Sequence, residues 1–212
     1  MTIEPAVLTI ARAAKGFMPD DEGLALYASA RRAARSGAGP LLEVGTYCGK
    51  SAVYLGAAAQ ETGTVLFTVD HHRGSEENQA GWEHHDPSVV DPATGRMDTL
   101  PWFRRTIEQA GLVSSVIAVV ATSAIAARWW TTPLSFLFID GGHGEDMVRA
   151  DEAAWVPHVA AGGLVAIHDV FPDPADGGRP PYELWRRLLD GGGFLDDPDL
   201  GCGSLRVVRR PQ

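Results

Sequence analysis

Stretches typical of β-strands alternate with stretches typical of helices along most of this chain, and four of the strands end in an acidic residue or a His-Asp pair. The four ends are Glu43, Asp70, Asp140 and His168-Asp169. Such alternation predicts a three-layer α/β fold with a mostly parallel sheet. Because ligands bind at the carboxyl ends of the strands in these sheets, we expect the four ends to meet in one cleft.

The expected elements cover most of the 212 residues. Strands are expected at 40–45, 64–70, 113–120, 134–140 and 164–169, with a C-terminal antiparallel hairpin at 193–196 and 203–209. Helices are expected at 3–15, 19–36, 49–60, 100–110, 123–130, 145–159 and 182–189. The length favours one domain, 1–212, in which residues 1–36 form an N-terminal helical cap. The segment 71–97 shows little periodicity and is expected to be a functional loop or lid.

The first strand leads through a turn between Gly45 and Gly49 into a helix that contains Ser51. Glycines let the backbone approach a ligand, and the amides of the first helical turn can bind an anionic group. The spacing is not GxGxxG and no Walker lysine is present, so an ordinary strand-to-helix turn is the alternative. Asp70 ends the next strand, where a carboxylate can bind ribose hydroxyls. Together these features indicate a nucleoside cofactor rather than a triphosphate.

The charge of the chain excludes some partners. The net charge is −9 and no run of Lys or Arg occurs, which argues against nucleic acid or an anionic membrane. No apolar run approaches the ~20 residues of a membrane span. The N-terminus carries Glu4 without a signal pattern, and the two cysteines, Cys48 and Cys202, lie far apart. A cytoplasmic protein with reduced thiols is expected.

The segment from Leu42 to Ser51 resembles, almost residue for residue, the first motif of class I S-adenosylmethionine-dependent methyltransferases. The chain is most similar to the branch that holds catechol O-methyltransferase and the bacterial sugar and macrolide O-methyltransferases. Asp70, Phe138-Ile139-Asp140 and 163–170 resemble later motifs in the expected order. The resemblance covers about residues 16–209 and implies a Rossmann-like methyltransferase fold with S-adenosylmethionine as cofactor.

The same resemblance implies a cofactor site. Glu43 and the amides around Gly45 and Tyr47 would hold the methionyl part, Ser51 would bind its carboxylate, and Asp70 would bind the ribose. Ser123 is the candidate for adenine, and Met18 belongs to a segment that closes over the cofactor. The full expected set is Met18, Glu43, Gly45, Thr46, Tyr47, Gly49, Ser51, Asp70, Ser123 and Asp140.

A divalent metal is also expected. In the related metal-dependent enzymes, an Asp after strand four and an acidic pair after strand five bind magnesium. Here Asp140 and His168-Asp169 stand at these places, and two carboxylates in one cleft repel each other without a cation. Three arrangements remain open: Asp140 and Asp169 hold magnesium with several waters, His168 joins and selects manganese or another ion, or no metal binds.

His143 stands three residues after Asp140, at the offset of the catalytic lysine in the catechol enzymes. A sugar hydroxyl becomes a good nucleophile only when a base takes its proton, and imidazole suits that role near neutral pH. His143 is therefore the expected catalytic base. The alternative is a surface or helix-capping histidine.

The loop after Asp70 is the expected acceptor site, because tryptophan stacks on sugar rings while imidazoles and carboxylates bind hydroxyls. A solvated lid without specific contacts is equally compatible with its composition. The candidate residues are His71, His72, Trp82, Glu83, His84 and His85. The core or a subunit interface is the expected place of Trp129-Trp130 and Trp155. A subunit interface would make the protein a homodimer.

These features indicate an S-adenosylmethionine-dependent, divalent-metal-assisted O-methyltransferase that acts on a hydroxyl of a sugar, either a saccharide or a glycosylated metabolite. The expected partner is a small-molecule or oligosaccharide acceptor. Three alternatives remain: a nicotinamide-dependent oxidoreductase, a non-catalytic cofactor-binding or scaffold protein, and a metal-independent methyltransferase for nitrogen or carboxylate acceptors.

Overall fold

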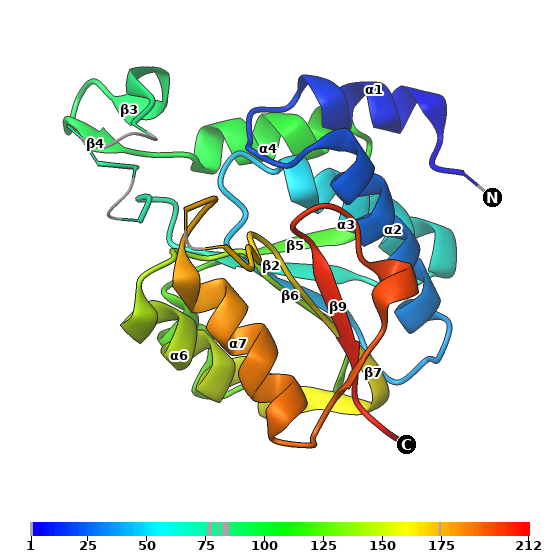
Figure 1. Ribbon diagram of the computed structural model, residues 1–212. Coiled ribbons are helices and arrows are strands. Elements are labelled where there is room, and N and C mark those ends of the chain that lie inside the picture. The colour runs from blue at the N-terminus through cyan, green and yellow to red at the C-terminus, as the bar shows by residue number, and fades with distance from the viewer. Residues whose placement is uncertain (1, 76–77, 80, 82–84, 174) are drawn as a thin grey trace.

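A computed structural model describes residues 2–75, 78–79, 81, 85–173 and 175–212. Among them, seven strands form one sheet in the order β5-β2-β1-β6-β7-β9-β8, and helices cover both of its faces (Figure 1). This confirms the predicted three-layer α/β fold with its C-terminal antiparallel hairpin. None of the helices in this part of the chain combines the length and the apolar content that crossing a bilayer requires.

The parallel part of the sheet contains five strands. They are β1 (Leu41–Val44), β2 (Leu66–Asp70), β5 (Val116–Val120), β6 (Leu134–Ile139) and β7 (Val159–Ile167). Two short strands, β8 (Leu195–Asp196) and β9 (Arg206–Arg209), pair antiparallel beyond β7. The chain runs outward from β1 through β2 to β5 and then returns to β6 beside β1. Ligands bind at such a reversal of strand order, so the crevice between the ends of β1 and β6 is the expected site.

In the described part of the chain, four α-helices lie on one side of the sheet and three lie on the other. The first group is α1 (Pro5–Ala13), α2 (Asp20–Ala34), α3 (Lys50–Thr62) and α4 (Leu100–Gln109). The second is α5 (Ser123–Ala127), α6 (Glu145–Trp155) and α7 (Arg179–Asp190), with α6 and α7 side by side in Figure 1. Acids in the first turns of α2 and α6 complement the positive ends of the helix dipoles.

Alternating strand residues feed two cores. Leu41, Leu66 and Phe136 pack toward the first helix group, whereas Leu42, Leu137 and Val165 pack toward α6 and α7. The period of two follows from the pleat of a strand whose two faces are both buried. As expected from the sequence, Trp155 lies in the core, fully buried, but Trp129 is 85% exposed.

Several boundaries differ from the prediction by a few residues: the helix predicted at 123–130 ends at Ala127, and the helix predicted at 182–189 begins at Arg179. Two larger differences concern the kind of element. The segment expected to lack regular structure contains a 3₁₀ turn, η2 (Pro87–Val89), and a hairpin of β3 (Val90–Asp91) and β4 (Arg96–Met97), because the Asp91 side chain caps its turn. The predicted helix 145–159 stops earlier: Val156–His158 form a 3₁₀ turn, η3, and β7 begins at Val159. Pro157 cannot donate the hydrogen bond that would continue α6.

Candidate functional site

A cleft of about 580 Å³ follows the carboxyl ends of the parallel strands. Its volume falls in the range of small-molecule sites. Every parallel strand contributes to the wall at or just after its end. Of the four strand ends expected to meet in one cleft, Asp70, Asp140 and His168-Asp169 line it, whereas Glu43 does not. The sequence-derived candidates that line it are Met18, Gly45, Thr46, Tyr47, Ser51, Asp70, His71, Ser123, Asp140, His143, His168 and Asp169.

The glycine turn approaches β6 so closely that a side chain does not fit. Gly45 has φ +82°, and a Cβ there would lie 2.2 Å from the backbone oxygen of Asp140. The Asp70 carboxylate fastens the turn to β2, since Oδ2 accepts the N–H groups of Thr46 and Tyr47 at 3.0 and 2.9 Å. The sequence predicted that amides of this turn face a methionyl group, but in this structure these two donate to Asp70.

Glu43 lies beneath the turn rather than on the cleft wall. It is fully buried, and its Oε1 accepts a 2.5 Å hydrogen bond from the Ser51 hydroxyl. Burial raises the pKa of Glu43 to about 8, and the Ser51 hydrogen bond offsets only part of that rise. Glu43 is not among the residues that line the cleft, and Ser51 connects it to the wall, so its contact with a cofactor stays a prediction. Gly49, the N-cap of α3 with φ +92°, also lies outside the residues that line the cleft.

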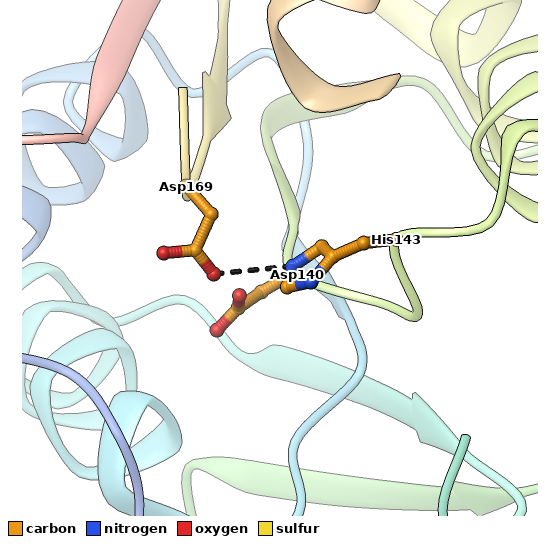
Figure 2. A group of neighbouring side chains, drawn as sticks. All are labelled: Asp140, His143 and Asp169. Carbon is orange, nitrogen blue, oxygen red and sulfur yellow. Dashed lines mark ion pairs between the residues drawn. The ribbon is translucent and has the colours of Figure 1, made fainter. Parts of the chain in front are cut away.

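Asp140, His143 and Asp169 come together at the ends of β6 and β7 (Figure 2). Each residue offers one atom that could bind a metal, and these three atoms all lie within 4.8 Å of one another. His143 Nε2 is 3.1 Å from Asp169 Oδ2. Burial raises the pKa of Asp169, but hydrogen bonds from His143 and His168 outweigh it and hold the pKa well below its usual range. The group can bind a cation or take a proton from a substrate.

His168 is the buried partner of these carboxylates. Its Nδ1 lies 3.2 Å from Asp140 Oδ1 and 3.3 Å from Asp169 Oδ2, and its Nε2 lies 2.6 Å from Glu22 Oε2. Burial alone would lower the pKa of His168, but the three carboxylates raise it well above its usual range. An imidazolium has no lone pair for a metal. The expected metal set contained His168, whereas the group within ligand distance contains His143 instead.

Glu22 reaches this network from α2, far away in the sequence. It is 5% exposed and also accepts the backbone N–H of Ser204 at 2.6 Å. Burial raises the pKa of Glu22, yet the contacts with His168 and Ser204 lower it overall. Glu22 is not distinguished in the sequence, because an acid in the first turn of a helix normally complements the helix dipole in solvent.

At the other end of the cleft, Ser123 lies between two residues of α6. The indole Nε1 of Trp155 donates to Ser123 Oγ at 2.8 Å, and the Ser123 hydroxyl bonds the carboxylate of Asp151. Asp151 is 6% exposed and lines the cleft. Burial raises its pKa. Asp151 could not be recognised from the sequence, because it occupies an ordinary polar position of an amphipathic helix.

Among the residues that the structure describes, three that are not glycine have left-handed backbone conformations, and all follow strands at this edge of the sheet. They are Tyr47 (φ 49°), His72 (φ 58°) and Asp169 (φ 55°). Such conformations cost about 1–3 kcal/mol each and gather at functional sites. For Asp169, the unusual φ accompanies a side chain held between two histidines.

The N-terminal segment borders the mouth of the cleft, as predicted for Met18. Met18 is buried, and the ring of Phe17 lies 5.6 Å from that of Tyr47. Lys15 binds Asp86 at 2.5 Å, which joins this segment to the loop before η2. The segment before α2 and the loop after β2 thus meet over one side of the cleft.

The predicted acceptor residues have different fates. His71 lines the cleft, whereas His72 is buried with its Nδ1 2.8 Å from Thr99 Oγ1. His85 Nδ1 lies 3.0 Å from the backbone oxygen of Asn78. The other three candidates, Trp82, Glu83 and His84, lie outside the described residues. Wall residues that the sequence did not single out include Phe171, Asp176 and Gly178.

Comparison with known proteins gives a family match over the centre of the chain. The sequence profile of a family described as "Methyltransferase domain" matches residues 42–170. Among solved structures, the chain resembles the SAH-bound methyltransferase PaMTH1 of Podospora anserina, with a TM-score of 0.66, 14% identity, and coverage of 100% of this chain and 90% of that chain. It also resembles the O-methyltransferase TomG of Streptomyces achromogenes in complex with SAM. For this structure the TM-score is 0.63 and the sequence identity is 16%, over 100% of this chain and 92% of that chain.

A third similar structure is CalS11, a TDP-rhamnose 3'-O-methyltransferase of calicheamicin biosynthesis. Its TM-score is 0.61 at 14% identity, over 89% of this chain and 79% of that chain. At such identities the likeness is one of fold. The fold is therefore the one that these methyltransferases share.

Proposed function

Because the chain belongs to the methyltransferase domain family, we propose that it transfers a methyl group from S-adenosylmethionine to a hydroxyl of a small molecule, with a sugar as the acceptor class. The observation that carries the proposal is the position of Asp140, His143 and Asp169 in the same cleft as the glycine turn. A cofactor on the turn would present its methyl group toward these three side chains.

The wall supports a nucleoside cofactor of this kind. The Asp70 carboxylate stands at the end of β2, where ribose hydroxyls are bound in folds of this type. Ser51 lies in the first turn of α3, whose N–H groups favour a carboxylate. The turn lacks the GxGxxG spacing of nicotinamide enzymes, which disfavours the oxidoreductase alternative.

His143 is the proposed base. Methyl transfer forms a C–O bond to the acceptor and breaks the C–S bond of the sulfonium, whose sulfur keeps the electron pair. The hydroxyl proton leaves to His143. If His143 Nε2–H donates to Asp169, the lone pair is on Nδ1, and the Asp169 carboxylate stabilises the imidazolium that forms. Alignment of the two reactants supplies the remaining acceleration.

The same cluster fits a divalent metal. Asp140 Oδ1 contacts His168, and Asp169 Oδ2 contacts both His168 and His143. Within these contacts, Asp140 Oδ2 and Asp169 Oδ1 remain for a cation. A bound metal would lower the pKa of the acceptor hydroxyl. With Asp140 and Asp169 as its ligands, and His143 left to act as the base, the carboxylate oxygens together with several waters would suit magnesium or manganese.

A metal-independent mechanism is the second candidate. The 2.6–3.3 Å contacts of His168 with three carboxylates place a buried positive charge where a metal would otherwise balance them. Under this candidate, His143 and Asp169 remove the proton without help. The two candidates use the same residues and differ in their response to chelation.

A sugar acceptor is supported by polar groups on the described wall. His71, Asn78 and Asp176 can bind hydroxyls, and Phe171 can cover an apolar ring face. The fold is shared with CalS11, which methylates a nucleotide sugar. The part of the wall that contains Phe171 and Asp176 is the proposed acceptor side.

The test is a methyl-transfer assay with S-adenosylmethionine and a panel of nucleotide sugars, glycosides and catechols. His143→Gln is expected to lower kcat about 10²- to 10⁴-fold, while S-adenosylhomocysteine affinity stays within about twofold. His158→Gln is the matched control, because His158 lies in η3, remote from the cleft wall. Normal kcat in His143→Gln would exclude His143 as the base.

A further inference from the structure

We infer that the Asp151 carboxylate recognises the 6-amino group of the cofactor's purine. This inference rests on the proposed function, because it requires S-adenosylmethionine as the ligand. It adds a specificity-determining residue that the transfer mechanism does not use. Asp151 is the buried carboxylate of the cleft wall that has neither a histidine nor an arginine beside it in the described contacts.

The position of the purine follows from the two ends of the cleft. Methyl transfer is assigned to the ends of β6 and β7, where Asp140 and His143 lie, and the ribose to Asp70 at the end of β2. The sheet order places β5 beyond β2, on the side away from β7. The purine therefore extends toward the wall built by the residues after β5 and by α6.

That wall has the chemistry of a purine site. Ala121, Ala124 and Ala150 offer small apolar surfaces for a flat ring. The Asp151 carboxylate lies beside Gly141, since a Cβ added to Gly141 would be 3.0 Å from Asp151 Oδ2. Glycine at 141 thus leaves a path between the ring and the carboxylate. A 6-amino group carries two N–H donors, and a carboxylate accepts them.

The contacts of Asp151 leave it capacity for a ligand. Among the described residues, the hydrogen-bond partner of its carboxylate is the Ser123 hydroxyl, which itself accepts from Trp155. A carboxylate has about four acceptor positions. A buried acid with so few donors is incompletely compensated for lost hydration, and a donating ligand would restore part of that loss.

A purely structural role predicts a different behaviour. If Asp151 only braced α5 against α6 through Ser123, its removal would weaken all cofactor analogues alike. If it binds the amino group, its removal weakens only ligands that carry that group. The ratio of two affinities separates these roles, whereas a single affinity does not.

The experiment is calorimetric titration of S-adenosylhomocysteine and of its analogue with hydrogen in place of the purine 6-amino group. Wild-type protein is expected to bind the analogue about tenfold to a hundredfold more weakly, as for a hydrogen bond to a charged group. In Asp151→Ala the ratio should fall to about one. Asp151→Asn, a closer replacement in shape, should fall between them. Asp146→Asn, an exposed change on the same helix, is the control and should keep the wild-type ratio.

Each outcome decides one question. A wild-type ratio near one, or an unchanged ratio in Asp151→Ala and Asp151→Asn, would overturn the inference. If Asp151→Ala does not fold, as judged by its melting curve, the ratio in Asp151→Asn decides. Failure of the wild-type protein to bind S-adenosylhomocysteine would overturn the proposed function itself, while binding with a ratio near one would overturn only the role of Asp151.

Discussion

Replacing Glu43 with Gln tests the electrostatics beneath the glycine turn. Glu43 is fully buried, and within the described residues its Oε2 has no hydrogen-bond partner. Burial raises its pKa from 4.5 to about 8. At neutral pH the folded chain therefore keeps a proton on this carboxyl group, whereas the unfolded chain has released it.

The sign and size of the effect follow from linkage. Between pH 4.5 and about 8, the folded state binds the proton that the unfolded state has lost, so the free energy of unfolding falls as the pH rises. Each pKa unit corresponds to about 1.4 kcal/mol. From pH 5 to pH 8 this carboxyl alone removes about 4 kcal/mol of stability, and Glu43→Gln lacks this slope.

Urea unfolding at pH 5, 6, 7 and 8 measures the difference between the two proteins. Relative to wild type, Glu43→Gln should gain about 4 kcal/mol across this range, whatever constant offset its amide adds. Glu61→Gln is the control: the hydrogen bond from Tyr27 lowers the pKa of Glu61, so its difference from wild type should not change with pH. A flat difference for Glu43→Gln would mean that the folded state holds Glu43 ionised, and the reasoning would fail.

Three further predictions concern the same edge of the sheet. Glu22→Gln should lower the free energy of unfolding at pH 7 by about 3 kcal/mol, since it removes one partner of the buried His168, while the adjacent exposed change Asp21→Asn should cost under about 1 kcal/mol in the same urea assay. Gly45→Ala should destabilise the fold by about 2 kcal/mol or more and abolish S-adenosylhomocysteine binding, because its Cβ would meet the Asp140 backbone. Calorimetry on the folded fraction measures the binding, and normal binding would contradict the close approach of the turn to β6. Chelation followed by gel filtration should lower kcat at least about tenfold, with recovery on manganese or magnesium; undiminished turnover would favour the metal-independent candidate.

The strand ends could be predicted from the sequence because their signal is local. A β-rich run followed by an acid identifies Asp70, Asp140 and Asp169, and parallel topology then brings the acids to one edge. The glycine turn could also be predicted, because its backbone conformation requires a glycine. Gly45 has a positive φ that other residues rarely adopt. These features are set by short-range geometry that repeats across α/β sheets.

The partners of His168 could not be predicted in the same way. Nothing near Glu22 in the sequence distinguishes it from an exposed acid at the start of a helix, and it reaches His168 only because α2 packs on the end of β7. Asp151 could not be predicted for a similar reason, since its buried carboxylate meets Ser123 of another helix. Which ring nitrogen meets which carboxylate is a property of tertiary packing.

Calorimetric titration with S-adenosylhomocysteine, beside NAD at matched concentrations, tests the central claim most directly. We expect S-adenosylhomocysteine to bind saturably at one site per chain and NAD not to bind. We also expect transfer of a labelled methyl group from S-adenosylmethionine to a hydroxyl acceptor. Gly45→Ala provides the matched protein control, because its side chain would enter the contact between the glycine turn and β6. Binding of NAD without S-adenosylhomocysteine, or binding of neither, would contradict the account.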